Sequence, residues 1–164
     1  MDRYKNLEWV VCRAHGIDTV NIEECRKRNV GVVATAPTAK PCGEWICNKI
    51  TDDDAVLIFG NGSISKEVQS RIGNFNVVDS KTEQKEIDRY LKFCKTIVIT
   101  IPLNKNTRNY FNRTLFSKIQ NEVTIISIAR GDVIDNGGLL EFSSSGKLKV
   151  GHFDMLSSDI RSTL

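Results

Sequence analysis

The sequence predicts an α/β fold built on a doubly wound parallel sheet, and three observations support this prediction. Apolar segments of strand length alternate with helix-like segments along most of the chain. Most of these apolar segments are continuous, which is typical of strands that helices cover on both faces of a sheet. A glycine turn, Gly60-Asn61-Gly62, follows one apolar run and precedes a helical segment. This is the order of elements in a β–α–β unit.

The expected strands are short runs rich in apolar residues. They lie at 7–12, 30–35, 55–59, 76–78, 96–101, 123–128 and 148–153. The expected helices connect them, at 21–28, 38–50, 65–72, 87–93, 113–119 and 138–143. Asn21 can cap the first helix, and Pro41 must lie in the first turn of the second. Ile87, Tyr90 and Leu91 fall on one face of the fourth helix, which should therefore be buried.

The segment 56–79 has the layout of a dinucleotide site. Gly60 would make the tight turn, and Gly62 has no side chain to keep a pyrophosphate from the backbone. The following helix would offer N–H groups and the positive end of its dipole to the phosphates. Asp79, about twenty residues after the first glycine, can accept hydrogen bonds from the adenosine ribose and would repel a 2′-phosphate, which favours NAD over NADP. The third position of the motif is Ser65, and short glycine strings also occur by chance, so the motif gains weight from its flanking strands.

A second informative segment ends in Ala129-Arg130-Gly131. The apolar run 123–128 brings Arg130 to the carboxyl end of a strand, which is the edge where ligands bind in open α/β sheets. A guanidinium at that edge can bind a carboxylate through two hydrogen bonds and polarise a neighbouring carbonyl. The alternative is an arginine that makes an ordinary surface ion pair.

Composition narrows the class of protein. A chain of 164 residues with 40% hydrophobic and 26% charged residues can form a proper core. The net charge of +3 comes from scattered basic residues, so we expect no nucleic-acid partner. No apolar run approaches the roughly 20 residues of a membrane span, and we expect no membrane partner. The five cysteines contain no C-x-x-C pair, which favours reduced thiols and a cytoplasmic location, and no metal site is expected.

Eight segments align in order with the motifs of one family, at 16–21, 33–37, 44–45, 60–65, 101–108, 129–135, 139–148 and 151–154. In these segments the chain resembles the D-isomer-specific 2-hydroxyacid dehydrogenases, which include glyoxylate/glycerate reductases and phosphoglycerate dehydrogenase. The resemblance implies a Rossmann-type NAD-binding domain over 37–164, incomplete at its C-terminus. It also implies that 1–36 is a remnant of a second, flavodoxin-like substrate domain.

The resemblance assigns roles to individual residues. Its cofactor contacts would be Gly60, Asn61, Gly62, Ser63, Ile64, Asp79, Pro102, Thr107, Ala129, Arg130 and Asp154. Its substrate contacts would be Ala14, His15, Gly16 and Arg130. Arg130 and Asp159 would be catalytic.

Some residues depart from the family pattern. Ser63 stands where the family usually has arginine. The family's acid/base histidine lies beyond the last residue of this chain, and Asp159 occupies the place of the glutamate that pairs with it. His152 lies inside the last expected strand, where packing is the expected role. Two hypotheses follow: a homodimeric, NAD-dependent oxidoreductase that interconverts a 2-oxo acid and a D-2-hydroxy acid, or a non-catalytic NAD-binding remnant.

Overall fold

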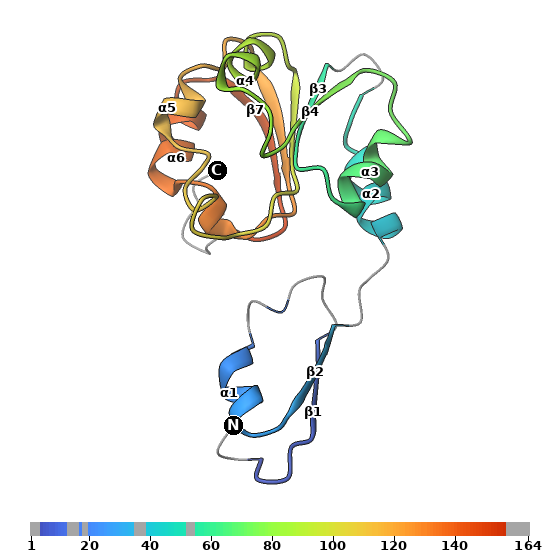
Figure 1. Cartoon of the computed structure of the whole chain (residues 1–164). Helices are drawn as coiled ribbons and strands as arrows, with labels where there is room; N and C mark the ends of the chain where they lie inside the picture. Colours follow the sequence, from blue (N-terminus) through green and yellow to red (C-terminus); the bar gives the residue numbers. More distant parts are fainter. Residues whose placement is uncertain (1–3, 13–16, 18–19, 35–38, 52–54, 157–164) are drawn as a thin grey trace. The chain divides into compact units, whose positions relative to one another are not determined.

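A computed structural model describes residues 4–12, 17, 20–34, 39–51 and 55–156. The chain divides into two compact units, residues 1–41 and 42–164. In the first unit, β1 (Trp9–Cys12) and β2 (Gly31–Ala34) form a parallel pair, and α1 (Ile22–Lys27) connects them (Figure 1). The side chain of Asn21 accepts a hydrogen bond from the Glu24 N–H at 3.0 Å, so the predicted N-cap is confirmed.

The second unit contains a sheet of five parallel strands (Figure 1). Their order across the sheet is β4 (Phe75–Val78), β3 (Val56–Phe59), β5 (Thr96–Ile99), β6 (Val123–Ser127) and β7 (Leu148–Phe153). The chain moves outward from β3 to β4, then returns to the other side of β3 and continues outward to β7. This reversal makes the sheet doubly wound and confirms the predicted fold class.

Helices cover both faces of this sheet. The helices are α2 (Ala39–Cys47), α3 (Ser63–Gln69), α4 (Gln84–Leu91), α5 (Arg113–Phe116) and α6 (Asn136–Ser144), with a short 3₁₀ turn, η1 (Gly131–Val133). The helices α2 and α3 lie on one face, whereas α4, α5 and α6 lie on the other (Figure 1). All four residues of β3 and of β5 are buried. Burial on both faces explains why the apolar runs in the sequence are continuous.

The larger core lies between the sheet and α4–α6. Its aromatic centre includes Phe59 and Phe111, whose ring centroids lie 4.8 Å apart at an interplanar angle of 74°. Phe116 of α5 and Phe142 of α6 stack at 4.9 Å. On α4, Ile87 and Leu91 are buried and Tyr90 is partly buried against this core. The predicted apolar face of that helix is therefore confirmed.

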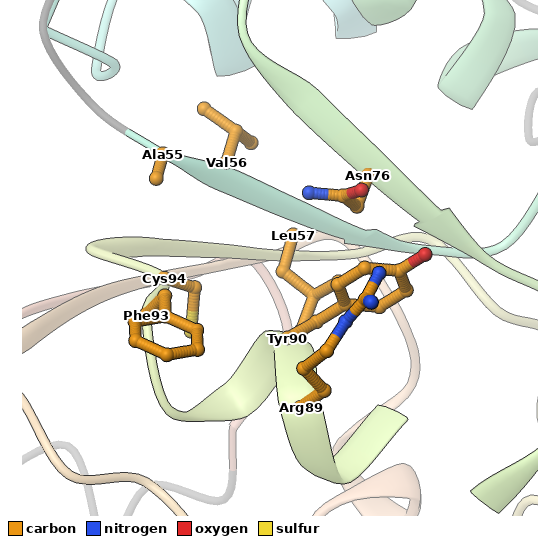
Figure 2. Close-up of a pocket in the computed structure, with 8 residues that line it drawn as sticks. All are labelled: Ala55, Val56, Leu57, Asn76, Arg89, Tyr90, Phe93 and Cys94. Carbon is orange, nitrogen blue, oxygen red and sulfur yellow. The ribbon is translucent and has the colours of Figure 1, made fainter. Parts of the chain in front are cut away.

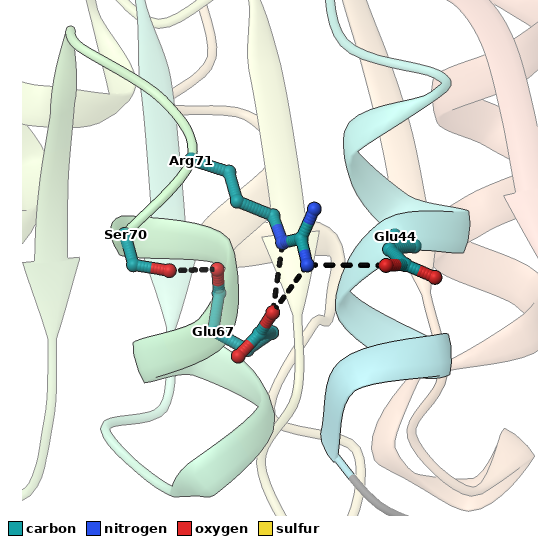
Figure 3. A network of polar contacts seen from close by, with 4 residues as sticks. All are labelled: Glu44, Glu67, Ser70 and Arg71. Carbon is teal, nitrogen blue, oxygen red and sulfur yellow. Dashed lines mark hydrogen bonds and ion pairs between the residues drawn. The ribbon is translucent and has the colours of Figure 1, made fainter.

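On the other face, polar contacts join α2 to α3. Arg71, which follows α3, contacts Glu67 of α3 and Glu44 of α2 through its guanidinium (Figure 3). The nitrogen–oxygen distances are 2.6 Å to Glu67 and 3.2 Å to Glu44. Gly43 lies close to the Glu67 side chain, and a Cβ on Gly43 would approach Glu67 Cγ at 2.4 Å. The α2 helix therefore lies close against α3.

The observed elements differ from the predicted ones mainly at their ends. The α3 helix begins at Ser63 and α4 at Gln84, two and three residues before the predicted starts. The α5 helix ends at Phe116, earlier than predicted. Apolar periodicity marks only the buried face of a helix, so a polar first turn leaves no signal. The η1 turn was not predicted, because three residues are too few to show a period.

Candidate functional site

The five strands of the second unit are parallel, so their carboxyl ends meet at one edge of the sheet. The residues that follow these ends are Gly60 after β3, Asp79 after β4, Thr100 after β5, Ala129 and Arg130 after β6, and Asp154 after β7. This edge is where open α/β sheets bind their ligands, at the point where strand order reverses. Here the reversal falls between β3 and β5. The sequence-predicted cofactor contacts of the second unit thus gather at one edge.

Gly60 makes the turn at the end of β3 in a left-handed conformation. Its φ is +115°, which side chains rarely tolerate. A Cβ here would lie 2.5 Å from Thr100 Oγ1. The Thr100 N–H and hydroxyl both donate to the Phe59 carbonyl, at 2.9 and 3.0 Å, which fixes the neighbouring strand end against the turn. Only glycine satisfies both the angle and the space.

Gly62, unlike Gly60, is not required by the backbone conformation. It is the N-cap of α3, and its φ of −84° is open to any residue. Apart from its chain neighbours, no atom of the described residues lies within 4 Å of a Cβ placed on Gly62. The protein's own packing therefore does not require glycine at this position. The space in front of Gly62 lies beside the first turn of α3, where the backbone N–H groups have no partners inside the helix. Such a space suits a bound phosphate.

Ser65 occupies the third position of the motif. Its side chain is completely buried where α3 approaches the sheet, and its hydroxyl accepts a hydrogen bond from Gln69 Nε2 at 2.8 Å. The polar atom that Ser adds relative to Ala is therefore satisfied within the helix itself. This explains how the motif tolerates a hydroxyl where small apolar residues are usual.

Asp79 lies beside the glycine turn, on the neighbouring strand end. Its Oδ1 accepts the Lys81 N–H at 2.8 Å, and its Oδ2 accepts Asn61 Nδ2 at 3.4 Å. The Asp79 N–H donates to Thr82 Oγ1 at 3.0 Å. The hydrogen bonds from the Lys81 backbone and then from Asn61 lower the pKa of the Asp79 carboxyl below its ordinary value. The carboxylate is therefore ionised at neutral pH.

Arg130 lies on a loop that a second loop holds in place. The Asn109 N–H donates to the Asp132 carbonyl at 2.8 Å, and the Phe111 N–H donates to the Val133 carbonyl at 3.1 Å. The guanidinium of Arg108 also pairs with the Asp132 carboxylate. These contacts join the segment after β5 to the segment after β6. Nothing in the sequence pattern indicated the Arg108–Asp132 pair, because its members are 24 positions apart.

Pro102 and Thr107 lie together in the loop after β5. The Thr107 hydroxyl donates to the Pro102 carbonyl at 2.6 Å and accepts the Asn104 N–H at 2.8 Å. The hydroxyl therefore shapes this loop directly. The predicted contact of both residues with adenine stays a prediction.

At the other side of the edge, the Asp154 N–H donates to the Ser127 carbonyl at 2.9 Å, so the residue after β7 lies against the end of β6. A Cβ on Gly131 would lie 3.1 Å from the Met155 carbonyl oxygen. The turn after Arg130 thus lies close to the segment that carries Asp154. Arg130 and Asp154, both predicted cofactor contacts, are therefore neighbours in the fold.

His152 lies within β7, one residue before the strand ends at Phe153. Its ring faces Trp45 of α2 edge-on, with centroids 6.4 Å apart. Burial, followed by the positive charge of Lys49, lowers the pKa of His152 below its ordinary value. The structure therefore shows His152 packed beside an aromatic ring, as expected from its place in the strand.

Four predicted site residues lie outside the described residues: Ala14, His15, Gly16 and Asp159. The described residues contain no cluster of three or more His, Cys, Asp or Glu side chains that could hold a metal ion. None of the helices in the described ranges is long and apolar enough to cross a bilayer. The five cysteines all lie in described segments, and the structure assigns none of them to a disulfide.

A distinct pocket of about 240 Å³ lies elsewhere, between the start of β3 and the end of α4 (Figure 2). Its lining includes Ala55, Asn76, Tyr90 and Phe93. Because Ala55 precedes β3, the pocket lies toward the amino ends of the strands, opposite the edge that carries Gly60 and Arg130. We therefore assign the candidate site to the strand-end edge and not to this pocket.

Comparison with known proteins gives a family match. The family model for the D-isomer specific 2-hydroxyacid dehydrogenase, NAD binding domain, matches residues 43–160. The hydroxypyruvate reductase of Thermotoga maritima is 22% identical over 191 residues, covering 92% of this chain and 62% of that protein. The formate dehydrogenase 2, mitochondrial, of Oryza sativa subsp. japonica is 27% identical over 126 residues, covering 63% of this chain and 33% of that protein.

Solved structures share the fold. A D-lactate dehydrogenase from Treponema pallidum superposes with a TM-score of 0.75 at 18% identity, covering 98% of this chain and 62% of that one. The NAD⁺-bound 3-phosphoglycerate dehydrogenase of Entamoeba histolytica gives 0.76 at 21% identity, covering 96% and 61%. The chain spans less than two thirds of each of these relatives.

Proposed function

We propose that the chain, which belongs to the D-isomer-specific 2-hydroxyacid dehydrogenase family and matches its NAD-binding domain, serves the NAD-dependent interconversion of a 2-oxo acid and a D-2-hydroxy acid. Membership confirms the family resemblance read from the sequence, and NAD as the cofactor of this domain. The substrate class, the catalytic residues and the contacts of individual residues with NAD are parts of the proposal.

The observation that carries the proposal is the pairing of the glycine turn with Asp79. The left-handed turn requires glycine at position 60, whereas a Cβ placed on Gly62 would have no atom of the described residues within 4 Å beyond its chain neighbours. Asp79, ionised at neutral pH, lies at the adjacent strand end. A pyrophosphate fits the open space at the turn, and a ribose diol fits the carboxylate. The residues present thus fit the adenosine diphosphate half of NAD.

In this proposal Asn61, Gly62, Ser63 and Ile64 surround the pyrophosphate. Pro102 and Thr107 line the adenine side, and Asp154 holds the nicotinamide carboxamide next to Ala129. When bound, the nicotinamide exchanges a hydride with the carbon that changes between carbonyl and alcohol. The residues of the chain bind and orient the two reactants around that exchange.

Arg130 is the proposed substrate anchor. Its guanidinium would bind the substrate carboxylate through two hydrogen bonds and polarise the adjacent carbonyl oxygen, which gains negative charge as the hydride arrives. By the family resemblance, the proton for that oxygen would come from the family's acid/base histidine, with Asp159 in the place of the glutamate that pairs with it. Ala14, His15 and Gly16 would present backbone N–H groups to the same carboxylate.

A second candidate function is NAD binding without turnover. One observation favours it: the ring of His152, the histidine in the described part of the chain, packs edge-on against Trp45 of α2, with centroids 6.4 Å apart. The two candidates share the cofactor site and differ only in whether chemistry follows binding.

The deciding experiment is a titration of the purified chain with NADH, with NADPH as the control, followed by turnover assays with glyoxylate, pyruvate and hydroxypyruvate. Saturable binding that favours NADH, with consumption of NADH in the presence of a 2-oxo acid, would support the dehydrogenase. Saturable binding without consumption would support the second candidate. A folded chain that binds neither nucleotide would overturn both.

Arg130→Ala separates substrate binding from cofactor binding. We expect this variant to bind NADH nearly as well as the wild type while losing all turnover. A loss of NADH affinity as large as that of Asp79→Ala would contradict the assignment of Arg130 to the substrate.

Three coarser features belong to the same proposal. A homodimer follows from the family resemblance and would be tested by light scattering during size-exclusion chromatography. A cytoplasmic location follows from the lack of disulfides among the five cysteines, which is typical of reducing compartments, and would be tested by cell fractionation. The assignment of 1–36 to a substrate domain and of 37–164 to the NAD-binding domain would be tested by limited proteolysis.

A further inference from the structure

We infer that Asn61 is a positioning residue for the ribose-binding carboxylate of Asp79, and that it thereby contributes to the preference for NAD over NADP. The inference rests on the proposed NAD-binding function. It gives the side chain of Asn61 a task distinct from that of the surrounding turn, whose backbone would approach the pyrophosphate.

The two residues come from neighbouring strand ends. In the parallel pair of β3 and β4, Phe59 is in register with Val78. Asn61 and Asp79 follow these residues at the same edge, and the Gly60 N–H donates to the Val78 carbonyl at 2.8 Å. The backbone thus holds the two loops together before any side chain is considered. Asn61 then reaches across to Asp79, with Nδ2 3.4 Å from Oδ2.

The two anchors of the carboxylate act on different oxygens. The Lys81 N–H donates to Oδ1 at 2.8 Å, and Asn61 Nδ2 donates to Oδ2. Without the Asn61 bond, the carboxylate loses its contact at Oδ2 and is held less firmly about its terminal torsion, which has no sharp preferred angle. The second bond fixes the plane of the group. Because each carboxylate oxygen has two acceptor sites, the group can accept a ribose hydroxyl in addition to these donors.

The negative charge of Asp79 favours NAD over NADP, as the orientation of its carboxylate does. The same donors lower the pKa of Asp79, so the group keeps its negative charge throughout the neutral range. An oriented, ionised carboxylate accepts from the 2′-hydroxyl of NAD and repels the 2′-phosphate of NADP. Asn61 would therefore strengthen NADH binding while leaving NADPH binding, which lacks that hydrogen bond, almost unchanged.

The test is a double-mutant cycle with Asn61→Leu, Asp79→Ala and the double variant, measured by calorimetric titration of the full chain with NADH and with NADPH. Leucine is close to asparagine in shape and removes the donor. We expect Asn61→Leu to weaken NADH binding about three- to tenfold, with NADPH unchanged. In the Asp79→Ala background the same substitution should have no further effect, because the group it positions is gone.

A matched control is Asn76→Leu, the same substitution on the exposed face of β4 beside the pocket of Figure 2, toward the other end of the strand. It should leave both affinities unchanged. If Asn61→Leu does not fold by circular dichroism, Asn61→Ala takes its place in the cycle.

Additive effects of the two substitutions, or equal losses for NADH and NADPH, would show that Asn61 acts on the pyrophosphate and would overturn the inference. A wild-type chain that binds neither nucleotide would overturn the proposed function itself. The two failures are distinguishable, because the first leaves wild-type NADH binding intact.

Discussion

Gln69 Nε2 donates a hydrogen bond to the buried hydroxyl of Ser65 at 2.8 Å, one helical turn away on α3. The contact lies where α3 approaches the sheet, at the third position of the glycine motif. A hydroxyl buried without a partner at this point would be costly. The partner on the same helix makes serine acceptable at a position that otherwise favours Gly or Ala.

Replacing Ser65 tests that contact. Ser65→Ala should lower the free energy of unfolding by about 1 kcal/mol, because the Gln69 amide loses its acceptor. Ser65→Val should cost about 1–3 kcal/mol, since Ser65 is completely buried and a larger side chain overpacks a buried position. Urea denaturation measures both. Ser70→Ala, which removes an exposed hydroxyl bonded to the Glu67 carbonyl (Figure 3), is the control and should change stability by less than about 0.5 kcal/mol. Equal effects at positions 65 and 70 would refute the argument.

Replacing each glycine of the turn by alanine should affect a different property: stability at Gly60 and NADH binding at Gly62. Gly60→Ala should destabilise the fold by about 1–3 kcal/mol, because alanine resists the left-handed angle and its methyl group would meet Thr100. Gly62→Ala should change stability by less than about 1 kcal/mol. It should nevertheless weaken NADH binding at least tenfold, by filling the space proposed for the pyrophosphate. Thermal unfolding together with NADH titration distinguishes the two effects. Unimpaired binding by a folded Gly62→Ala variant would place the pyrophosphate elsewhere.

The lowered pKa of His152 makes stability depend on pH. The unfolded chain holds this histidine at an ordinary pKa of about 6.5, and the folded chain binds its proton less readily. Stability from this group is therefore fully present above about pH 6.5 and is lost as the pH falls toward the folded pKa. His152→Phe, which keeps a ring beside Trp45, should flatten the dependence of unfolding free energy on pH in that window.

The Lys49 contribution to this shift can be tested separately. Lys49→Gln removes the positive charge near His152, so the pKa of His152, followed by NMR titration, should rise toward its ordinary value. Burial, the larger cause, should keep it below that value. A His152 pKa at or above 6.5 in the wild type would contradict both predictions.

The contacts of Arg71 with Glu67 and Glu44 predict a salt-sensitive link between α2 and α3. Arg71→Gln should lower the urea midpoint slightly at low ionic strength, and the difference should vanish in high salt, because partly exposed ion pairs are screened. Lys85→Gln is the matched control. Its pair with Glu83 is mostly exposed and joins residues two positions apart, so no change is expected. A salt-independent loss in Arg71→Gln would indicate packing of its carbon chain in place of charge.

The order and type of the α-helices and strands in both units, though not the short η1 turn, could be predicted from the amino-acid sequence. Continuous apolar runs such as 96–99 can be buried only in a sheet covered on both faces, and the glycine turn after β3 signals its conformation through residue type. The Asp79 position followed from its place one residue past the β4 run. These features are local, so the residues that encode them are adjacent or periodically spaced.

Which side chains meet at the edge became clear only from the assembled fold. The Asn61–Asp79 contact depends on the pairing of β3 with β4, and the Arg108–Asp132 pair depends on the order of β5 and β6. Strand order is set by the packing of the whole sheet and leaves no mark in local spacing. The sequence could therefore predict which residues lie at strand ends but not their partners, because a contact across strands is a property of two distant segments at once.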